Sequence, residues 1–236
     1  MEGNKVAMSL KIKAMVGLAL LLSTLLHAAD QLVRFRSEQE SRVRIEGTGT
    51  LHDWQVQGET INGLLEVGAG FPIEPRQKVR LGKVSAQTEV SIPVASLQGV
   101  DLNGKPTGKT MNRNLHELLR EQTSSNILYR LNELVLKTAP ETEADGYAFE
   151  SRGALIVAGI TNQVSMPIRV FPLGNGKLKI TGNVSVRMTD FSIRPPTVRL
   201  SPGSGASSGQ EIKLAHDEVQ LRFEWFLVRE QTKQSQ

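Results

Sequence analysis

The chain has 236 residues, no cysteine, and 28 basic against 24 acidic side chains. This length suits one large all-β domain or two small domains. The lack of cysteine excludes disulfides, thiolate metal sites, cysteine nucleophiles and a lipoprotein anchor. The small basic excess is spread along the chain without long basic runs, so composition argues against nucleic-acid binding.

The N-terminal segment has the pattern of a secretory signal peptide. Three lysines precede the apolar run 14–26, and Ala28 and Ala29 follow it. A basic segment, a short apolar stretch and small residues are typical of such peptides, and the run is short for a transmembrane helix. We therefore predict a signal peptide over 1–29 and an exported chain over 30–236, periplasmic or secreted, with no stable membrane span. An uncleaved anchor is the alternative.

From residue 42 onward, apolar and polar residues alternate in a series of segments. Near the C-terminus, for example, Leu221 and Phe223 alternate with Arg222 and Glu224. A period of two gives each strand one dry face and one wet face, which favours an antiparallel sandwich or barrel. The pattern predicts about eight strands, at 42–46, about 53–58, 61–67, 84–95, 126–137, 147–158, 163–188 (as a hairpin) and 217–228.

Two segments interrupt this alternation. Residues 111–122 follow a helical period, and we expect one short helix near the mouth of a barrel. Its apolar stripe consists of Met111, Leu115, Leu118 and Leu119. The Gly- and Ser-rich segment 201–210 is predicted to be a surface loop. Within the hairpin, Gly174-Asn175-Gly176 is predicted to form the turn.

Two loop sequences approach known catalytic or nucleotide-binding motifs. Residues 205–209 (GASSG) fit the nucleophile-elbow pattern around Ser207, but no helix follows them. Residues 103–110 (NGKPTGKT), which contain Lys109, approach a P-loop. An asparagine replaces the first glycine, however, and Pro106 removes one amide from the phosphate cradle. We interpret both segments as polar loops without these functions.

The polar candidates for metal binding or acid–base catalysis are few. They are His52, Asp53, His116, His216 and Asp217. No two of these histidines have the i, i+2 or i, i+4 spacing of a metal site. We therefore predict no catalytic residue, no metal and no cofactor. Chemistry at the barrel mouth would require His52, Asp53 and His116 to come together.

Five stretches, in order along the chain, together resemble the YceI-like family of secreted lipid-binding domains. They are 45–54 (IEGTGTLHDW), 92–97 (IPVASL), 111–115 (MNRNL), 153–161 (GALIVAGIT) and 188–193 (MTDFSI), the last followed by Pro195 and Pro196. The resemblance covers about residues 42–228. The chain departs from the family at 124–129, which lacks a usual proline, and in the extended loops 99–110 and 200–216.

The resemblance implies a single domain that folds as an eight-stranded antiparallel, lipocalin-like barrel. It also implies extracytoplasmic binding of a long apolar lipid in the barrel, as polyisoprenoid, quinone-type chains are bound in that family. Barrels of this size either hold one small ligand or fill with side chains. The alternative is therefore a non-enzymatic interaction or structural module with a filled core. The sequence leaves open whether the chain forms a homodimer.

The period of two, together with the helical stripe, selects candidates for the apolar lining of such a barrel. These candidates are Trp54, Ile92, Val94, Leu115, Leu119, Tyr129, Phe149, Leu155, Val157, Met166, Ile168, Val186, Met188, Phe191, Leu221 and Phe223.

Overall fold

The computed structural model describes residues 32–101, 103–142, 144–199 and 211–231. The predicted signal peptide and Ser207 lie outside the described residues. Among those described, no helix is both long enough and apolar enough to cross a membrane. The unit that begins at Val33 is built almost entirely of β-strands.

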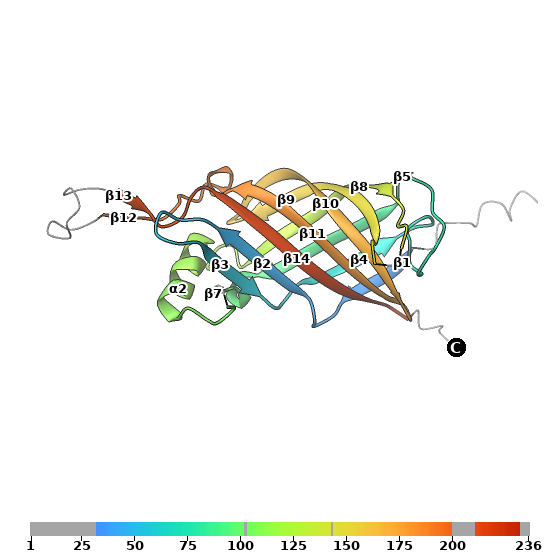
Figure 1. Cartoon of the computed structure of the whole chain (residues 1–236), viewed down its shortest axis with the longest axis horizontal. Coiled ribbons are helices and arrows are strands. Elements are labelled where there is room, and N and C mark those ends of the chain that lie inside the picture. The colour runs from blue at the N-terminus through green and yellow to red at the C-terminus, as the bar shows by residue number, and fades with distance from the viewer. Residues whose placement is uncertain (1–31, 102, 143, 200–210, 232–236) are drawn as a thin grey trace, which may run out of the picture. The chain divides into compact units, whose positions relative to one another are not determined.

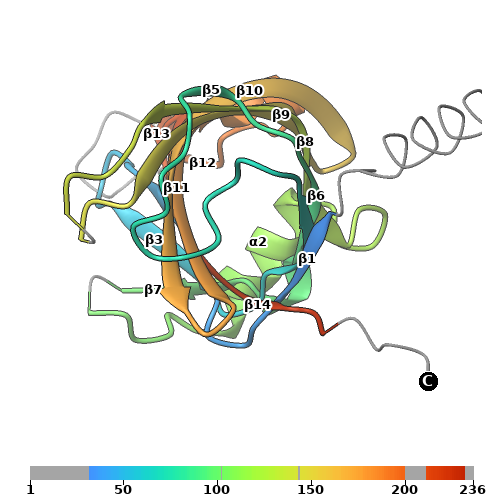
Figure 2. The ribbon, with the colours of Figure 1, turned by 90° about the vertical axis from the view of Figure 1, so that its right-hand side faces the viewer.

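Antiparallel strands close into an eight-stranded barrel (Figures 1 and 2). In order around the ring they are β1 (Val33–Ser37), β4 (Asn62–Val67), β6 (Ala86–Pro93), β8 (Asn126–Thr138), β9 (Tyr147–Val157), β10 (Ile160–Gly174), β11 (Lys177–Arg187) and β14 (Glu218–Arg229). The ring is closed because β1 pairs with both β4 and β14. The all-β class and the eight-stranded antiparallel barrel are thus confirmed.

Shorter elements extend this barrel. They are β2 (Arg42–Gly47), β3 (Trp54–Gly58), β5 (Gly82–Lys83), β7 (Gln98–Val100), β12 (Thr197–Arg199), β13 (Glu211–Lys213) and the 3-10 helices η1 (Val94–Ser96) and η2 (Met188–Phe191). β2 pairs with β14, and β3 joins β2 to β7. β5 pairs with β8, while β12 and β13 form a separate two-stranded ribbon. The sequence did not predict β1, β5, β7, β12 or β13.

Burial along the strands follows the predicted period of two. On β9, Tyr147 and every second residue through Val157 are buried. The expected hairpin over 163–188 is present as β10 and β11, which pair directly. All three residues of its turn, Gly174, Asn175 and Gly176, have positive φ angles of 78°, 52° and 71°. Glycine and asparagine accept that conformation most readily, which explains why this sequence turns here.

The helix α2 (Lys109–Leu118) lies across one end of the barrel, as seen in Figure 2, where the view runs along the barrel. It ends earlier than the predicted 111–122. The physical reason is Arg120, which has a left-handed φ of 55°. Its guanidinium donates hydrogen bonds to the carbonyl oxygens of Ala158, at 3.3 Å, and Ser192, at 3.2 Å. The backbone therefore leaves the helical conformation at this point, and the Arg120 side chain is hydrogen-bonded to the turn after β9 and to the residue after η2.

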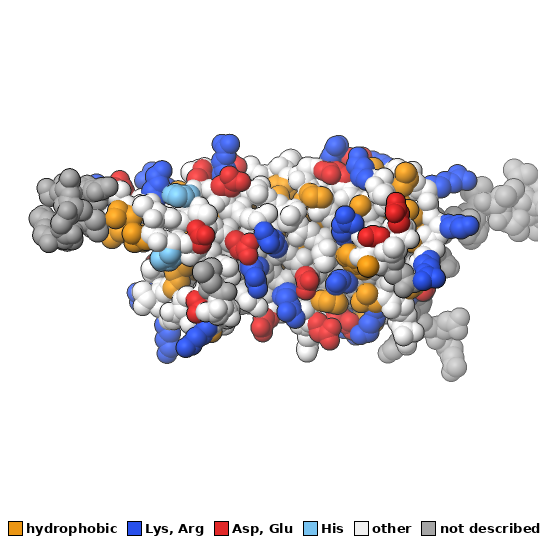
Figure 3. All heavy atoms as spheres, viewed as in Figure 1, with side chains coloured by type: hydrophobic (Ala, Val, Ile, Leu, Met, Phe, Trp, Pro, Cys, Tyr) orange, Lys and Arg blue, Asp and Glu red, His pale blue; other side chains and the backbone are white. Residues whose placement is uncertain are grey.

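The outer surface carries charges of both signs. On the face shown in Figure 3, acidic and basic side chains are interspersed along the barrel wall. Several form ion pairs across neighbouring strands, such as Arg34 with Glu66 and Arg130 with Glu89, each at 2.6 Å. Pairs this exposed contribute little stability. The fold therefore depends on its interior and on how the ring closes.

The closing seam has one interruption, between β1 and β2. Both strands pair with β14, and residues 38–41 loop out between them. The backbone N–H of Glu38 donates to the carbonyl of Phe226 at 2.8 Å. The N–H of Phe226 has no strand partner there, and instead donates to the hydroxyl of Ser41 at 3.0 Å. Ser41 is 1% exposed, so its side chain replaces a backbone group within the ladder.

We expect Ser41→Ala to destabilise the protein by about 1–3 kcal/mol, because the N–H of Phe226 would lose its partner at a largely buried position. Chemical denaturation measures this as a lower free energy of unfolding. Ser85→Ala is the matched control, since Ser85 is exposed and its loss should change stability by no more than about 0.5 kcal/mol. Equal stability of the two variants would contradict this account of the seam.

Candidate functional site

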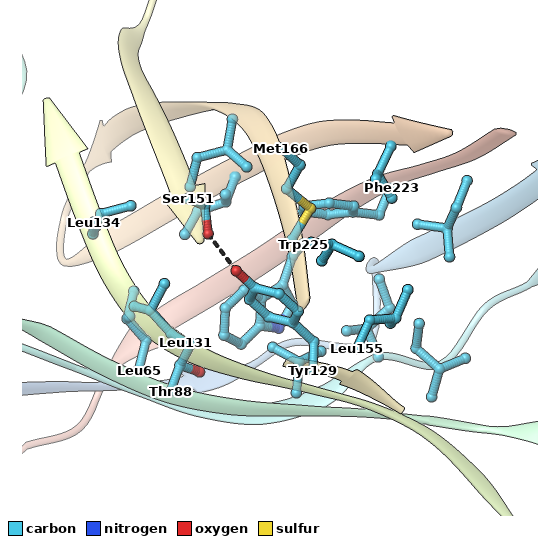
Figure 4. A pocket seen from close by; sticks show the side chains of 18 of the residues that line it. Leu65, Thr88, Tyr129, Leu131, Leu134, Ser151, Leu155, Met166, Phe223 and Trp225 are labelled. Carbon is cyan, nitrogen blue, oxygen red and sulfur yellow. Dashed lines mark hydrogen bonds between the residues drawn. The ribbon is translucent and has the colours of Figure 1, made fainter. Parts of the chain in front are cut away.

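The barrel encloses an apolar cavity of about 90 Å³, here called the inner cavity. Side chains from β4, β6, β8, β9, β10, β11 and β14 line it, as the close view in Figure 4 shows. The lining includes seven of the sequence candidates, namely Ile92, Tyr129, Leu155, Met166, Ile168, Leu221 and Phe223. It also includes residues that the sequence analysis did not select, among them Leu65, Leu131 and Trp225. These lie in phase with the predicted inward faces of their strands.

A second cavity of about 290 Å³ lies beneath α2 and is here called the helix-end cavity. Its walls contain eight of the candidates, namely Trp54, Leu115, Leu119, Leu155, Val157, Val186, Met188 and Leu221. All four residues of the predicted helical stripe face it. Leu51 and Leu214 also border it while being 63% and 41% exposed. Wall residues of this cavity therefore reach the protein surface at the helix end.

Three side chains border both cavities: Ile127, Leu155 and Leu221. The two spaces are therefore adjacent and are separated only by flexible apolar side chains. Apolar side chains therefore extend without interruption from the middle of the barrel to its helix end.

Three candidates line neither cavity, and the sequence prediction for them is corrected. Val94 lies in η1 and Phe191 in η2, where each packs into the core at a strand end. Phe149 does face inward, but its ring stacks on Phe71 at a centroid distance of 5.7 Å. Alternation along a strand gives the direction of a side chain, but it does not show which neighbour fills the space beyond.

The inner cavity exists because large rings lie against its wall where a neighbouring strand has glycine. A Cβ atom on Gly153 would lie 2.7 Å from Cζ and Oη of Tyr129. A Cβ atom on Gly182 would likewise lie 2.7 Å from Cζ of Phe223. Both distances are shorter than van der Waals contact. Each ring therefore occupies the space that a side chain on the next strand would need, and leaves the centre open.

The inner cavity contains one polar pair, shown in Figure 4. The hydroxyl groups of Tyr129 on β8 and Ser151 on β9 lie 2.6 Å apart and form a hydrogen bond. Burial raises the pKa of the Tyr129 phenol above its usual value, and the bond to Ser151 opposes this in part. Ser151 is 2% exposed and was not among the sequence candidates. Its position in phase with Phe149 and Leu155 was the signal that could have identified it.

The histidines and aspartates considered for catalysis are held separately. His52 bonds the backbone carbonyl of Asp53, whereas His116 bonds the carbonyl of Leu97 and pairs with Glu121. Chemistry at the barrel mouth would require His52, Asp53 and His116 to come together, and these contacts do not join them. Within the described ranges, no cluster of three or more potential metal ligands is found.

His216 and Asp217 make hydrogen bonds that join neighbouring segments of the chain. The ring of His216 bonds the hydroxyl of Thr48 at 2.9 Å. Asp217 accepts hydrogen bonds from the backbone N–H and the hydroxyl of Thr189 at the start of η2. These bonds lower the pKa of the Asp217 carboxyl, the side-chain bond having the larger effect. A carboxylate fixed in this way stabilises a turn and is not poised to exchange protons.

Backbone amides of the P-loop-like segment 103–110 bind the carboxylate of Asp101, which lies just before it. Asp101 accepts hydrogen bonds from the backbone N–H groups of Asn103, at 2.9 Å, and Lys105, at 2.8 Å. Two amides that a phosphate cradle would present are therefore already occupied. Lys109 is the first residue of α2. The interpretation of residues 103–110 as a structural loop agrees with this geometry.

Comparison with known proteins identifies the fold. No protein-family model and no curated protein sequence matches this chain. Among solved structures, Burkholderia cenocepacia BcnA is 14% identical, with a TM-score of 0.54 over 80% of this chain and 98% of BcnA. A polyisoprenoid-binding domain from Saccharophagus degradans is 11% identical, with a TM-score of 0.53 over 85% of this chain and 100% of that domain.

A Campylobacter jejuni YceI protein is 13% identical, with a TM-score of 0.47 over 75% of this chain and 85% of that protein. The first two matches, with TM-scores of 0.54 and 0.53, show the fold alone at these low identities, and the ligand has to be argued from the site itself. The chain therefore has the barrel fold of BcnA and of the Saccharophagus polyisoprenoid-binding domain.

Proposed function

We propose that the exported protein binds and carries one long apolar lipid chain, of the polyisoprenoid type, inside its barrel. The observation that carries this proposal is the pair of adjacent apolar cavities inside the barrel, which share wall residues. The polyisoprenoid-binding domain of similar fold supports the choice of ligand class. Ligand sites of this kind need an apolar lining and few polar anchors.

The energetics of such a site are favourable. Burying a methylene group contributes about 0.8 kcal/mol, so about ten methylenes contribute on the order of 8 kcal/mol before the cost of association. The helix-end cavity provides an entrance, because Leu51 and Leu214 are exposed at its border. A chain that enters there meets apolar side chains as far as Leu65 and Trp225 in the inner cavity.

A filled-core interaction module is the second candidate. The observation that favours it is the small volume of the inner cavity, about 90 Å³, which a long chain can enter only if the three shared side chains rotate. The two proposed functions predict different effects of an enlarged inward side chain on lipid binding and on stability. Leu221 is the position at which to test this, because it borders both cavities.

We expect Leu221→Trp to reduce the lipid recovered by solvent extraction and mass spectrometry, because the new ring occupies the path of the chain. Stability of the lipid-stripped variant should change little. In a filled core the same substitution is overpacking and costs about 1–3 kcal/mol. Leu173→Trp is the control, since Leu173 is 49% exposed on β10. No lipid in the parent protein, combined with a destabilised Leu221→Trp variant, would overturn the carrier proposal.

Tyrosine ionisation reports on the inner cavity. The chain has two tyrosines, so Tyr147→Phe leaves Tyr129 as the only one. Because burial raises its pKa, less than half of the phenol should ionise at about pH 10 in the folded, lipid-stripped protein. A bound lipid excludes more water and should raise the pKa further.

An alkaline titration followed by tyrosinate absorbance measures both effects. The raised folded-state pKa favours the protonated phenol, so its stabilising contribution is present below about pH 10 and is lost as the pH rises through the folded-state value. An ordinary pKa in the folded protein, or the same pKa with and without lipid, would argue against an apolar cavity at Tyr129.

Export is tested by fractionation of cells that express the full chain. The basic segment and the apolar run 14–26 should direct the protein out of the cytoplasm and leave a mature chain that starts near Asp30. N-terminal sequencing of the extracytoplasmic protein gives the cleavage site. Introducing a charged residue into the run, as in Leu20→Arg, should retain the protein inside. Full-length parent protein in the cytosol would refute export.

A further inference from the structure

The hydroxyl pair of Tyr129 and Ser151 is an unusual feature of the inner cavity. A hydroxyl placed in an apolar interior loses its bonds to water, and this loss is costly unless each group finds a partner. The two groups here partner each other at 2.6 Å. Gly153 makes this possible, because the absence of a Cβ atom lets the Tyr129 ring cross β9 and reach Ser151. Three residues on two strands therefore place the pair inside the barrel.

The pair retains one hydroxyl hydrogen that is not used. Two hydroxyl groups bring two O–H donors, and a single bond between them uses one. Neither group has another hydrogen-bond partner among the described residues. The other polar groups in the wall are satisfied, since Thr88 donates to the carbonyl of Leu64 and the indole of Trp225 donates to Ser37. The inner cavity therefore offers one donor to a guest molecule.

The remaining wall decides what kind of guest that donor can serve. The residues that line the inner cavity include no lysine, arginine or histidine. A carboxylate or phosphate would be buried there without a counter-charge, which is far more costly than burying a neutral oxygen. A lone water molecule would also find few partners, because the surroundings of the pair are apolar.

We infer that the ligand is a neutral lipid with an oxygen acceptor at one end, and that this end binds to the Tyr129–Ser151 pair deep in the barrel. The tail runs past Ile127, Leu155 and Leu221 towards the helix-end cavity. The lipid therefore enters with its polar end first. This inference rests on the proposed lipid-carrier function and specifies the class of ligand and its orientation.

A competition experiment tests the inference. The lipid-stripped protein is incubated with equal amounts of hexadecanol, hexadecane and hexadecyl phosphate, and bound lipid is extracted and quantified by mass spectrometry. We expect hexadecanol to be retained and hexadecyl phosphate to be excluded. In the double variant Tyr129→Phe/Ser151→Ala, which removes both hydroxyl groups and with them the donor, the ratio of bound alcohol to bound alkane should fall about twofold to tenfold relative to the parent, which is the value of one net hydrogen bond. Comparing ratios between variants cancels the different solubilities of the lipids.

Tyr147→Phe is the matched control. Its hydroxyl donates to the carbonyl of Gln77, and Tyr147 lines neither cavity, so the ratio should equal that of the parent. An unchanged ratio in the double variant Tyr129→Phe/Ser151→Ala, with alkane still bound, would overturn the inference and leave the carrier function intact. Failure of every lipid to bind the parent would instead overturn the carrier function.

One other donor provides a rival position for the polar end. The indole N–H of Trp54 is buried without a partner among the described residues, and Trp54 borders the helix-end cavity. If the lipid entered tail first, Trp54→Phe would lower the ratio of alcohol to alkane and the double variant Tyr129→Phe/Ser151→Ala would not. That result would overturn the inferred orientation. Retention of hexadecyl phosphate by the parent would overturn the requirement for a neutral end.

Discussion

The close approach of aromatic rings to glycines on neighbouring strands is the constraint on which the interior depends. Tyr129 lies over Gly153, Phe223 over Gly182, and Trp225 approaches within 2.9 Å of where a Cβ atom of Gly63 would be. Each ring is held against the wall, and the centre of the barrel stays open. A Cβ atom at these positions would clash with the rings, and at Gly153 and Gly63 with the backbone of the neighbouring strand as well. The rings can therefore lie against the wall only because these three positions are glycine.

The same arrangement explains why the sequence predicted the direction of the lining residues better than their role. Apolar and polar residues alternate in β14 from Val219 to Trp225, so the inward positions of Leu221 and Phe223 followed directly from the sequence. Whether an inward ring borders a space or another ring depends on a neighbouring strand. Phe149 packs against Phe71, and no pattern within β9 distinguishes it from Leu155.

The elements that the sequence did not predict are those defined by distant contacts. β1 has only five residues and pairs with the chain's last strand, so no local pattern identifies it as part of a barrel. The helix ends early because Arg120 reaches Ala158 and Ser192, residues that are far from it in the sequence. By contrast, the β10–β11 turn was predictable, because Gly174, Asn175 and Gly176 specify it locally.

The seam between β1 and β14 also determines when the molecule can fold. Ser37 and Trp225, which hydrogen-bond across it, are 188 residues apart in the chain, and β14 also supplies partners for β2 and β11. Until β14 has emerged from the ribosome, these three strands have unpaired edges and no barrel can close. Such non-local pairing slows folding. The strands from β4 to β11 can pair with one another without β14, but the ring itself is completed only when two segments from distant parts of the sequence meet.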